Sequence, residues 1–162
     1  MNFQELEHLG EPDLSICGLR LWIHGRQFPA ATDYWDGNWL RVTVYCLYPH
    51  SVVRIQNDPC IRVDELAGLL RGCEQMHATL SGKAALQCME PYLAVELAAA
   101  TNGHIGVKLS ITADNMTETH EYEDEIDQSY LPSIISSCQA ILARFPLCDP
   151  KRKDSSNGHG ST

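Results

Sequence analysis

The chain has 162 residues, of which 44% are hydrophobic, and its formal net charge at pH 7 is -9. This length is typical of one domain with a hydrophobic core of its own. The negative charge argues against a nucleic-acid-binding surface, because such surfaces neutralise phosphates with lysine and arginine. If the protein has a macromolecular partner, we expect a basic one.

Seven cysteines occur singly, without any C-x-x-C pair, and an odd number cannot close completely into intramolecular disulfides. We interpret them as buried thiols in a reducing cytosol. The first 14 residues carry four carboxylates and no apolar stretch typical of a signal peptide, and no later window has the apolar length of a membrane span. We therefore expect a cytoplasmic protein that does not insert into a membrane.

The polarity of the chain predicts three parts. Residues 1–13 are polar and acidic, which favours a flexible N-terminal arm. Residues 14–147 contain the periodic apolar patterns and are expected to form a single domain. Residues 148–162 are expected to be a disordered tail, because from Lys151 onward the chain offers no apolar residue to bury.

Alternating apolar and polar residues predict strands in the first third of this domain. The first lies within residues 14–23 and the second within 40–47. A third, at 53–56, is expected to end at the turn signal Asn57-Asp58-Pro59, with a few further extended residues at 60–63.

Helical spacing of apolar residues then predicts a helix over 65–79, with Asp64 as its N-cap. Four further extended runs follow, at 84–89, 92–99, 105–111 and 116–126. The dipeptide Asn102-Gly103 predicts a hairpin between the middle two of these runs.

A second amphipathic helix is predicted over 130–145, with Ser129 as its N-cap. Pro132 is compatible with the first turn, where no backbone N–H is needed, and Pro146 ends the helix. Most connections are too short for parallel crossovers. The expected fold is a single two-layer α+β domain, in which an antiparallel sheet of about six or seven strands packs with two amphipathic helices.

The segment Gln27–Leu40 holds two of the three tryptophans between two predicted strands. Its Asp36-Gly37-Asn38 stretch is suited to a tight turn, and its aromatic residues offer large apolar faces. They either plug one end of the core or form a binding surface with aromatic anchors. The candidate binding residues here are Tyr34, Trp35, Asp36 and Trp39.

A second concentration of polar residues is acidic. Residues 112–127 include seven carboxylates and no lysine or arginine. The run fits a solvated edge strand that its charge protects from aggregation, or a docking surface for a basic partner, and the two are compatible. The candidate binding residues here are Glu118, Glu121, Glu123, Asp124, Glu125 and Asp127.

Catalytic and cofactor motifs are missing from the sequence. The seven histidines are scattered and none lies in an H-E-x-x-H motif. There is no G-x-S-x-G, no P-loop lysine and no G-x-G-x-x-G. We therefore predict no catalytic residue, no metal and no cofactor, although a Cys-His pair formed in the fold stays open.

Several longer motifs occur in order. They are Gln27-Phe28-Pro29, the run from Asp33 to Leu40, Leu80-Ser81-Gly82-Lys83-Ala84, Asn102-Gly103-His104, the run from Asp127 to Pro132, and Arg144-Phe145-Pro146. With them, the sequence resembles the WapI-type bacterial immunity proteins over about residues 14–147. The resemblance implies a small cytosolic protein without catalytic activity, which binds and neutralises a contact-dependent toxin domain, in that family a nuclease.

Two function classes are therefore weighed. The first is a non-catalytic binding protein, an immunity protein whose partner is a cognate, basic toxin domain. The second is a small-molecule binder or an enzyme whose pocket lies beside Trp22, His24, Trp35 and Trp39, because aromatic residues next to an antiparallel sheet can line an apolar pocket.

Overall fold

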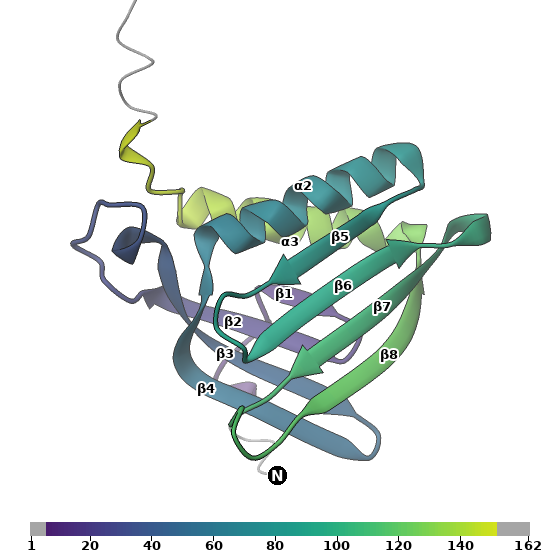
Figure 1. The fold of residues 1–162 in the computed structure, drawn as a ribbon, viewed down its shortest axis with the longest axis horizontal. Coiled ribbons are helices and arrows are strands. Elements are labelled where there is room, and N and C mark those ends of the chain that lie inside the picture. The colour runs from purple at the N-terminus through teal and green to yellow at the C-terminus, as the bar shows by residue number, and fades with distance from the viewer. Residues whose placement is uncertain (1–5, 152–162) are drawn as a thin grey trace, which may run out of the picture.

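The computed structural model describes residues 6–151, which form two four-stranded antiparallel sheets and two helices (Figure 1). The predicted α+β class and its antiparallel pairing are confirmed. The strands number eight, in two sheets of four, where the sequence predicted about six or seven in one sheet.

The first sheet has the strand order β1-β2-β3-β4. Its strands are β1 (Leu14–Ile16), β2 (Leu19–Arg26), β3 (Trp39–Tyr48) and β4 (Ser51–Arg62). The run predicted at 14–23 thus consists of two strands, and Cys17 turns the chain between them with a φ of 51°.

The Asn57-Asp58-Pro59 signal does not end a strand, as the sequence predicted, but lies inside β4. Asn57 has a φ of 51°, and the β3–β4 register shifts on either side of Val42. These are the marks of a bulged strand, which bends and then continues. The continuation brings β4 to Arg62, directly before a helix.

The second sheet has the order β5-β6-β7-β8. Its strands are β5 (Lys83–Gln87), β6 (Leu93–Ala99), β7 (His104–Ile111) and β8 (His120–Asp127). The predicted Asn102-Gly103 hairpin is confirmed: β6 and β7 pair antiparallel across a short 3-10 turn, η2 (Thr101–Gly103), in which Asn102 has a φ of 60°.

Both predicted helices are present, as α2 (Val63–Thr79) and α3 (Leu131–Arg144). Their predicted N-caps were wrong. Asp64 lies within the first turn of α2, which begins after Arg62. The N-cap position of α3 is Tyr130. Before it lies a 3-10 turn, η3 (Gln128–Tyr130), whose N-cap is Asp127, and the carboxylate of Asp127 accepts the N–H of Ser129 at 2.7 Å.

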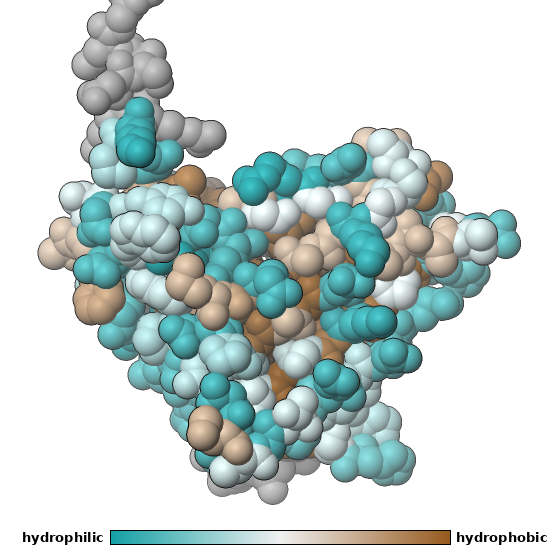
Figure 2. Space-filling view, in the orientation of Figure 1, coloured by the Kyte–Doolittle hydropathy of each residue, from teal (hydrophilic) through white to brown (hydrophobic). Residues whose placement is uncertain are grey.

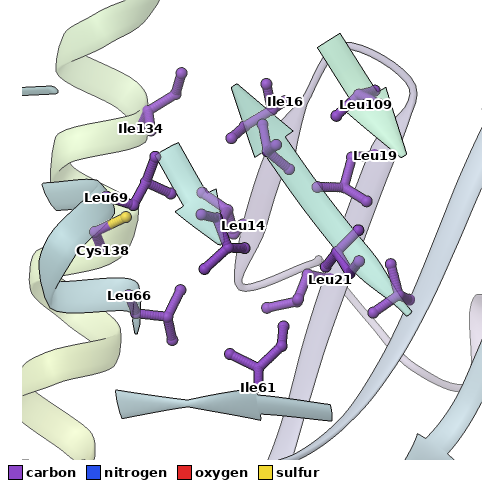
Figure 3. Packing of buried hydrophobic residues seen from close by; sticks show 14 of the residues in the cluster. Leu14, Ile16, Leu19, Leu21, Ile61, Leu66, Leu69, Leu109, Ile134 and Cys138 are labelled. Carbon is purple, nitrogen blue, oxygen red and sulfur yellow. The ribbon is translucent and has the colours of Figure 1, made fainter. Parts of the chain in front are cut away.

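The hydrophobic core lies between the two sheets and the two helices. Figure 3 shows apolar side chains of β1 and β2 near those of α2 and α3, with Leu109 of β7 close by. The labelled core residues Leu14, Leu21, Leu66 and Cys138 are fully buried. One face of the second sheet therefore belongs to the core, and its other face is turned outward.

The two sheets are joined where β8 meets the end of β3. Tyr48 and Tyr122 stack with ring centroids 4.3 Å apart and an interplanar angle of 7°. The hydroxyl of Tyr122 lies 2.8 Å from that of Ser51, and the hydroxyl of Tyr48 donates to Asp124 at 3.2 Å. Side chains from segments far apart in sequence thus fasten one sheet to the other.

Part of the expected N-terminal arm is within the described residues and contacts the first sheet. The indole of Trp22 donates to the carbonyl of Gly10 at 3.0 Å. Asp13 accepts the N–H of Ile23 at 2.7 Å and the guanidinium of Arg144 at 2.6 Å. Residues 1–5 of the expected arm and 152–162 of the expected tail lie outside the described residues.

Two glycines of α2 provide a matched test of the helix–sheet contact. A Cβ at Gly72 would lie 2.7 Å from the Cα of Ala84 in β5, whereas a Cβ at Gly68 would meet only the end of the Arg71 side chain, at 3.8 Å. Gly68→Ala should raise the free energy of unfolding by up to about 1 kcal/mol through helix propensity. Gly72→Ala should lower it, because overpacking costs about 1–3 kcal/mol.

Urea unfolding followed by circular dichroism measures both changes. Equal stabilisation by the two substitutions would contradict the close approach of α2 to β5.

Candidate partner-binding site

Strand alternation sorts the carboxylates of β8 onto two faces of the second sheet. Glu121, Glu123, Glu125 and Asp127 share the outward face. Asp124 belongs to the opposite face, where it accepts the hydroxyl of Tyr48. Because successive side chains of a strand point to opposite faces, the acidic run is a one-sided array from which Asp124 is excluded.

The neighbouring strands present mostly small residues on the same outward face. In the antiparallel register, Glu121 lies opposite Ser110, Glu123 opposite Lys108, and Glu125 opposite Gly106. One strand further, β6 places Ala94, Glu96 and Ala98 beside these three β7 residues, in that order. We call the outward side chains of β5 to β8 the outer face of the second sheet.

Two hollows mark the outer face, one on each side of the row formed by Glu96, Lys108 and Glu123. The larger, about 330 Å³, is lined by residues that include Ala94 and Ser110. The smaller, about 160 Å³, is lined by residues that include Ala98 and Gly106. Figure 2 shows this side of the molecule, with apolar atoms reaching the surface between hydrophilic side chains.

The charges around these hollows are predominantly negative. The outer face carries five carboxylates, those of Glu96 and the four outward β8 residues, against two lysines. Lys83 lies 3.3 Å from Glu96, and His104 lies 2.8 Å from Glu125. Both contacts are solvent-exposed and contribute little to stability. The excess of carboxylates is available to an external cation.

The remaining acidic candidates are held by local contacts. Glu118 precedes β8, where its carboxylate accepts the N–H of Ala113 at 3.2 Å and its carbonyl accepts the hydroxyl of Thr112 at 2.8 Å. Hydrogen bonds from Ser129 lower the pKa of Asp127, so this carboxylate is ionised while it caps the turn before α3. Both residues therefore stabilise the local structure at the ends of β8.

The segment Gln27–Leu40, which we call the Trp-rich segment, is organised around a buried cation, Arg62, whose role the sequence did not reveal. Its side chain is fully buried. The guanidinium donates to the carbonyls of Trp35 at 2.7 Å and Tyr34 at 2.8 Å, and to the carboxylate of Asp64 at 3.0 Å. The rings of Tyr34, Trp35 and Trp39 lie 5.0 to 5.3 Å from it. The aromatic residues thus surround a buried charge, a contact that the sequence did not predict for them.

The burial of Arg62 depends on the pairing of β3 with β4, which the sequence did not predict. Arg62 pairs with Trp39 across β3 and β4, and its N–H donates to Glu65 at 2.8 Å as α2 begins. An arginine between a strand and a helix is more often exposed, so burial could not be inferred without knowing that Trp39 lies opposite it.

A buried asparagine ties the same segment to the chain after α3. The side-chain amide of Asn38 donates to the carbonyls of Tyr34 at 2.7 Å and Cys148 at 3.0 Å, and its oxygen accepts the N–H of Cys148 at 2.9 Å. Arg26 adds hydrogen bonds to the carbonyls of Gly37 and Pro146. The short helical turn η1 (Asp36–Asn38) is therefore fixed on both sides.

Of the four candidates in this segment, the structure exposes two. The side chain of Trp35 is 62% exposed, although its carbonyl is bound by Arg62. Asp36 is also exposed and donates its N–H to Asp33 at 2.8 Å, a bond that lowers the pKa of the Asp33 carboxyl. Tyr34 and Trp39 are partly buried against Arg62. The aromatic candidates lie at the connection between β2 and β3 of the first sheet, whereas the acidic candidates lie on or beside β8 of the second.

The alternative pocket beside the tryptophans finds little support in this packing. Trp22 is buried, with its ring 5.9 Å from that of Tyr45 in an edge-to-face contact, and His24 lies 2.6 Å from the hydroxyl of Thr43. A further hollow of about 650 Å³ lies elsewhere, between the β1–β2 turn, β8 and the start of α3. It includes none of the residues named for the alternative.

Burial controls the chemistry of the cysteines. It raises the pKa of Cys138 to about 12 and is also the main cause that raises the pKa of Cys17 to about 12, where Asp124 adds to it. These shifts are opposite to those of a nucleophilic thiolate. Within residues 6–151, no group of three or more potential metal ligands comes together, and no helix has the length and apolar character needed to cross a bilayer.

Replacing Arg62 tests the organisation of the Trp-rich segment. Arg62→Met removes the buried cation but leaves the carbonyls of Tyr34 and Trp35 and the Asp64 carboxylate in place, so we expect a loss of about 3–5 kcal/mol in the free energy of unfolding. Tryptophan emission should shift to the red as the segment loosens. The control, Arg71→Met, removes an exposed arginine of α2 and should change stability by less than about 0.5 kcal/mol.

The raised thiol pKa values predict a pH dependence. A thiol near pKa 8.5 when unfolded and near 12 when folded leaves the unfolded chain with fewer protons between these values, so stability falls as pH rises through that window. In urea titrations from pH 7 to 10, Cys138→Ala should show a shallower decline than the parent protein. Parallel declines would contradict a protonated, buried thiol.

Comparison with known proteins identifies a family. The model of the immunity protein WapI-like family matches residues 12–146, which confirms the resemblance seen in the sequence. No curated protein and no solved structure matches the chain significantly. Because the family match spans both sheets and both helices, the chain belongs to the WapI-like immunity protein family.

Proposed function

We propose that this protein is a cytoplasmic, non-catalytic immunity protein, which binds a cognate toxin domain and neutralises it by occluding the toxin's substrate-binding or active surface. The observation that carries the proposal is the one-sided array of carboxylates on β8, in a family member with a net charge of -9. The family supplies the class of function, and the array supplies a surface suited to it.

The physical argument is charge complementarity. A toxin that acts on nucleic acid needs a basic surface to neutralise phosphates. An acidic inhibitor is attracted to the same surface, and the summed field of its carboxylates raises the rate of encounter. A nuclease domain is therefore the toxin class we propose.

The first experiment uses the toxin domain encoded beside this protein. The two proteins should co-purify, and co-expression should restore growth to cells that produce the toxin. Absence of both binding and rescue with that toxin would contradict the proposed function.

A charge-matched pair of variants tests the acidic array. The triple variant Glu121→Gln, Glu123→Gln, Glu125→Gln leaves the Tyr48–Asp124 bond intact and should slow association about tenfold at low ionic strength, since steering contributes about 10- to 1,000-fold. Its association rate should also depend less on salt. Stopped-flow fluorescence or surface plasmon resonance measures both quantities.

The control neutralises three exposed carboxylates away from β8, with the variant Glu7→Gln, Glu11→Gln, Glu74→Gln. It changes the net charge by the same amount. Equal slowing by both variants would assign the effect to net charge and not to the array.

A further inference from the structure

The small residues in the outer face of the second sheet have no evident role within the fold. Gly106 lies in the middle of β7, where glycine weakens a strand because it has no side chain to pack. Its φ is not in the left-handed region, and a Cβ added there would meet only the carbonyl oxygen of Ala98, at 3.9 Å. Neither backbone conformation nor close internal packing therefore requires glycine at this position.

Gly72 of α2 differs from Gly106 in this respect. There, an added Cβ would meet Ala84 at 2.7 Å, so the fold itself requires the missing side chain. At Gly106, the open space lies outside the molecule. Glycine inside a strand also marks places where another molecule approaches the backbone closely.

Neighbouring positions extend the same pattern. Solvent-facing positions of a sheet favour β-branched and aromatic residues, which cover the backbone. Here Ala98 pairs with Gly106, and Ala94 pairs with Ser110, which leaves a hollow at each pair. Ala85 and Ala94 line the larger hollow, and Ala98 and Gly106 line the smaller. The methyl groups of these alanines make the floor of both hollows partly apolar.

The rim of both hollows carries more carboxylates than cations. Glu96 and Glu123 line both hollows, with Lys108 between them. Glu121 adds a carboxylate to the larger hollow, and Asp124 lines the smaller. An apolar floor below a carboxylate rim suits a side chain with an aliphatic stem and a cationic head, which is the chemistry of lysine and arginine. A second copy of this chain does not fit, because its own outer face would bring carboxylates against carboxylates.

We propose that the outer face of the second sheet is the docking surface for the basic toxin partner, and that a lysine or arginine of the toxin enters each hollow. This assignment rests on the proposed immunity function. The floor pairs lie four residues apart along β6, so the two basic side chains should be about 13 Å apart. Their stems contact the small residues, and their charged heads reach the rim carboxylates.

Filling the hollows separates binding from folding. The double variant Ala94→Thr, Gly106→Thr places one β-branched side chain in each hollow and leaves every charge unchanged. Its melting temperature should equal or exceed that of the parent, because threonine favours strands more than alanine or glycine does. Its Kd for the neighbouring toxin domain, made inactive by substitution, should rise at least tenfold, mainly through faster dissociation.

The control, Ala140→Thr with Ala143→Thr, makes comparable changes at exposed positions of α3 and should leave the Kd unchanged. If the parent protein binds and the filled variant binds equally well, the docking surface is wrong and the immunity function stands. If the parent protein neither binds the toxin nor rescues growth, the immunity function fails, and the docking assignment falls with it. Loss of binding together with a lowered melting temperature in the filled variant would overturn the claim that the fold does not require small residues at these two positions.

Discussion

The buried guanidinium of Arg62 is the interaction on which one end of this fold depends. It lies where β4 ends and α2 begins, and it binds two carbonyls of the Trp-rich segment as well as Asp64. A cation without water needs such partners, because an unpaired buried charge is very costly. The strand, the helix and the segment must therefore form together, and the aromatic rings complete the enclosure of the charge.

The second sheet is stabilised differently. Its inner face contributes apolar residues to the common core, and β8 is fastened to the first sheet by the Tyr48–Tyr122 stack. Asp124 takes part in that contact from the face of β8 opposite to the outward carboxylates. Structural and surface roles thus alternate along a single strand, and the same pleat separates the core from the outer face.

Local patterns in the sequence predicted the elements well, because they depend on neighbouring residues. The Asn102-Gly103 hairpin and the apolar stripe of α3 needed no knowledge of distant contacts. The division into two sheets could not be predicted, since it depends on which strands remain unpaired. Asn57-Asp58-Pro59 was misread for a related reason: the same residues support a turn or a bulge, and pairing with β3 decides between them.

The candidate site divides in the same way. Alternation alone separates Glu121, Glu123 and Glu125 from Asp124, so the one-sidedness of the array was available from the sequence once β8 was placed. The enclosure of Arg62 by residues 34 to 39 was not, because it depends on the register between two strands and on a loop that folds back. The small residues of β6 and β7 alternate in sequence with the core residues of these strands, but their common face appears only with the sheet assembled.

The separation between Arg62 and the outer face has an evolutionary consequence. Side chains on the outer face lie on solvent, so replacing them removes few of the contacts that hold the core together. Substitutions in such places typically change stability by less than about 0.5 kcal/mol. A scaffold built in this way can exchange one set of surface side chains for another as a binding partner changes, with little effect on its own folding.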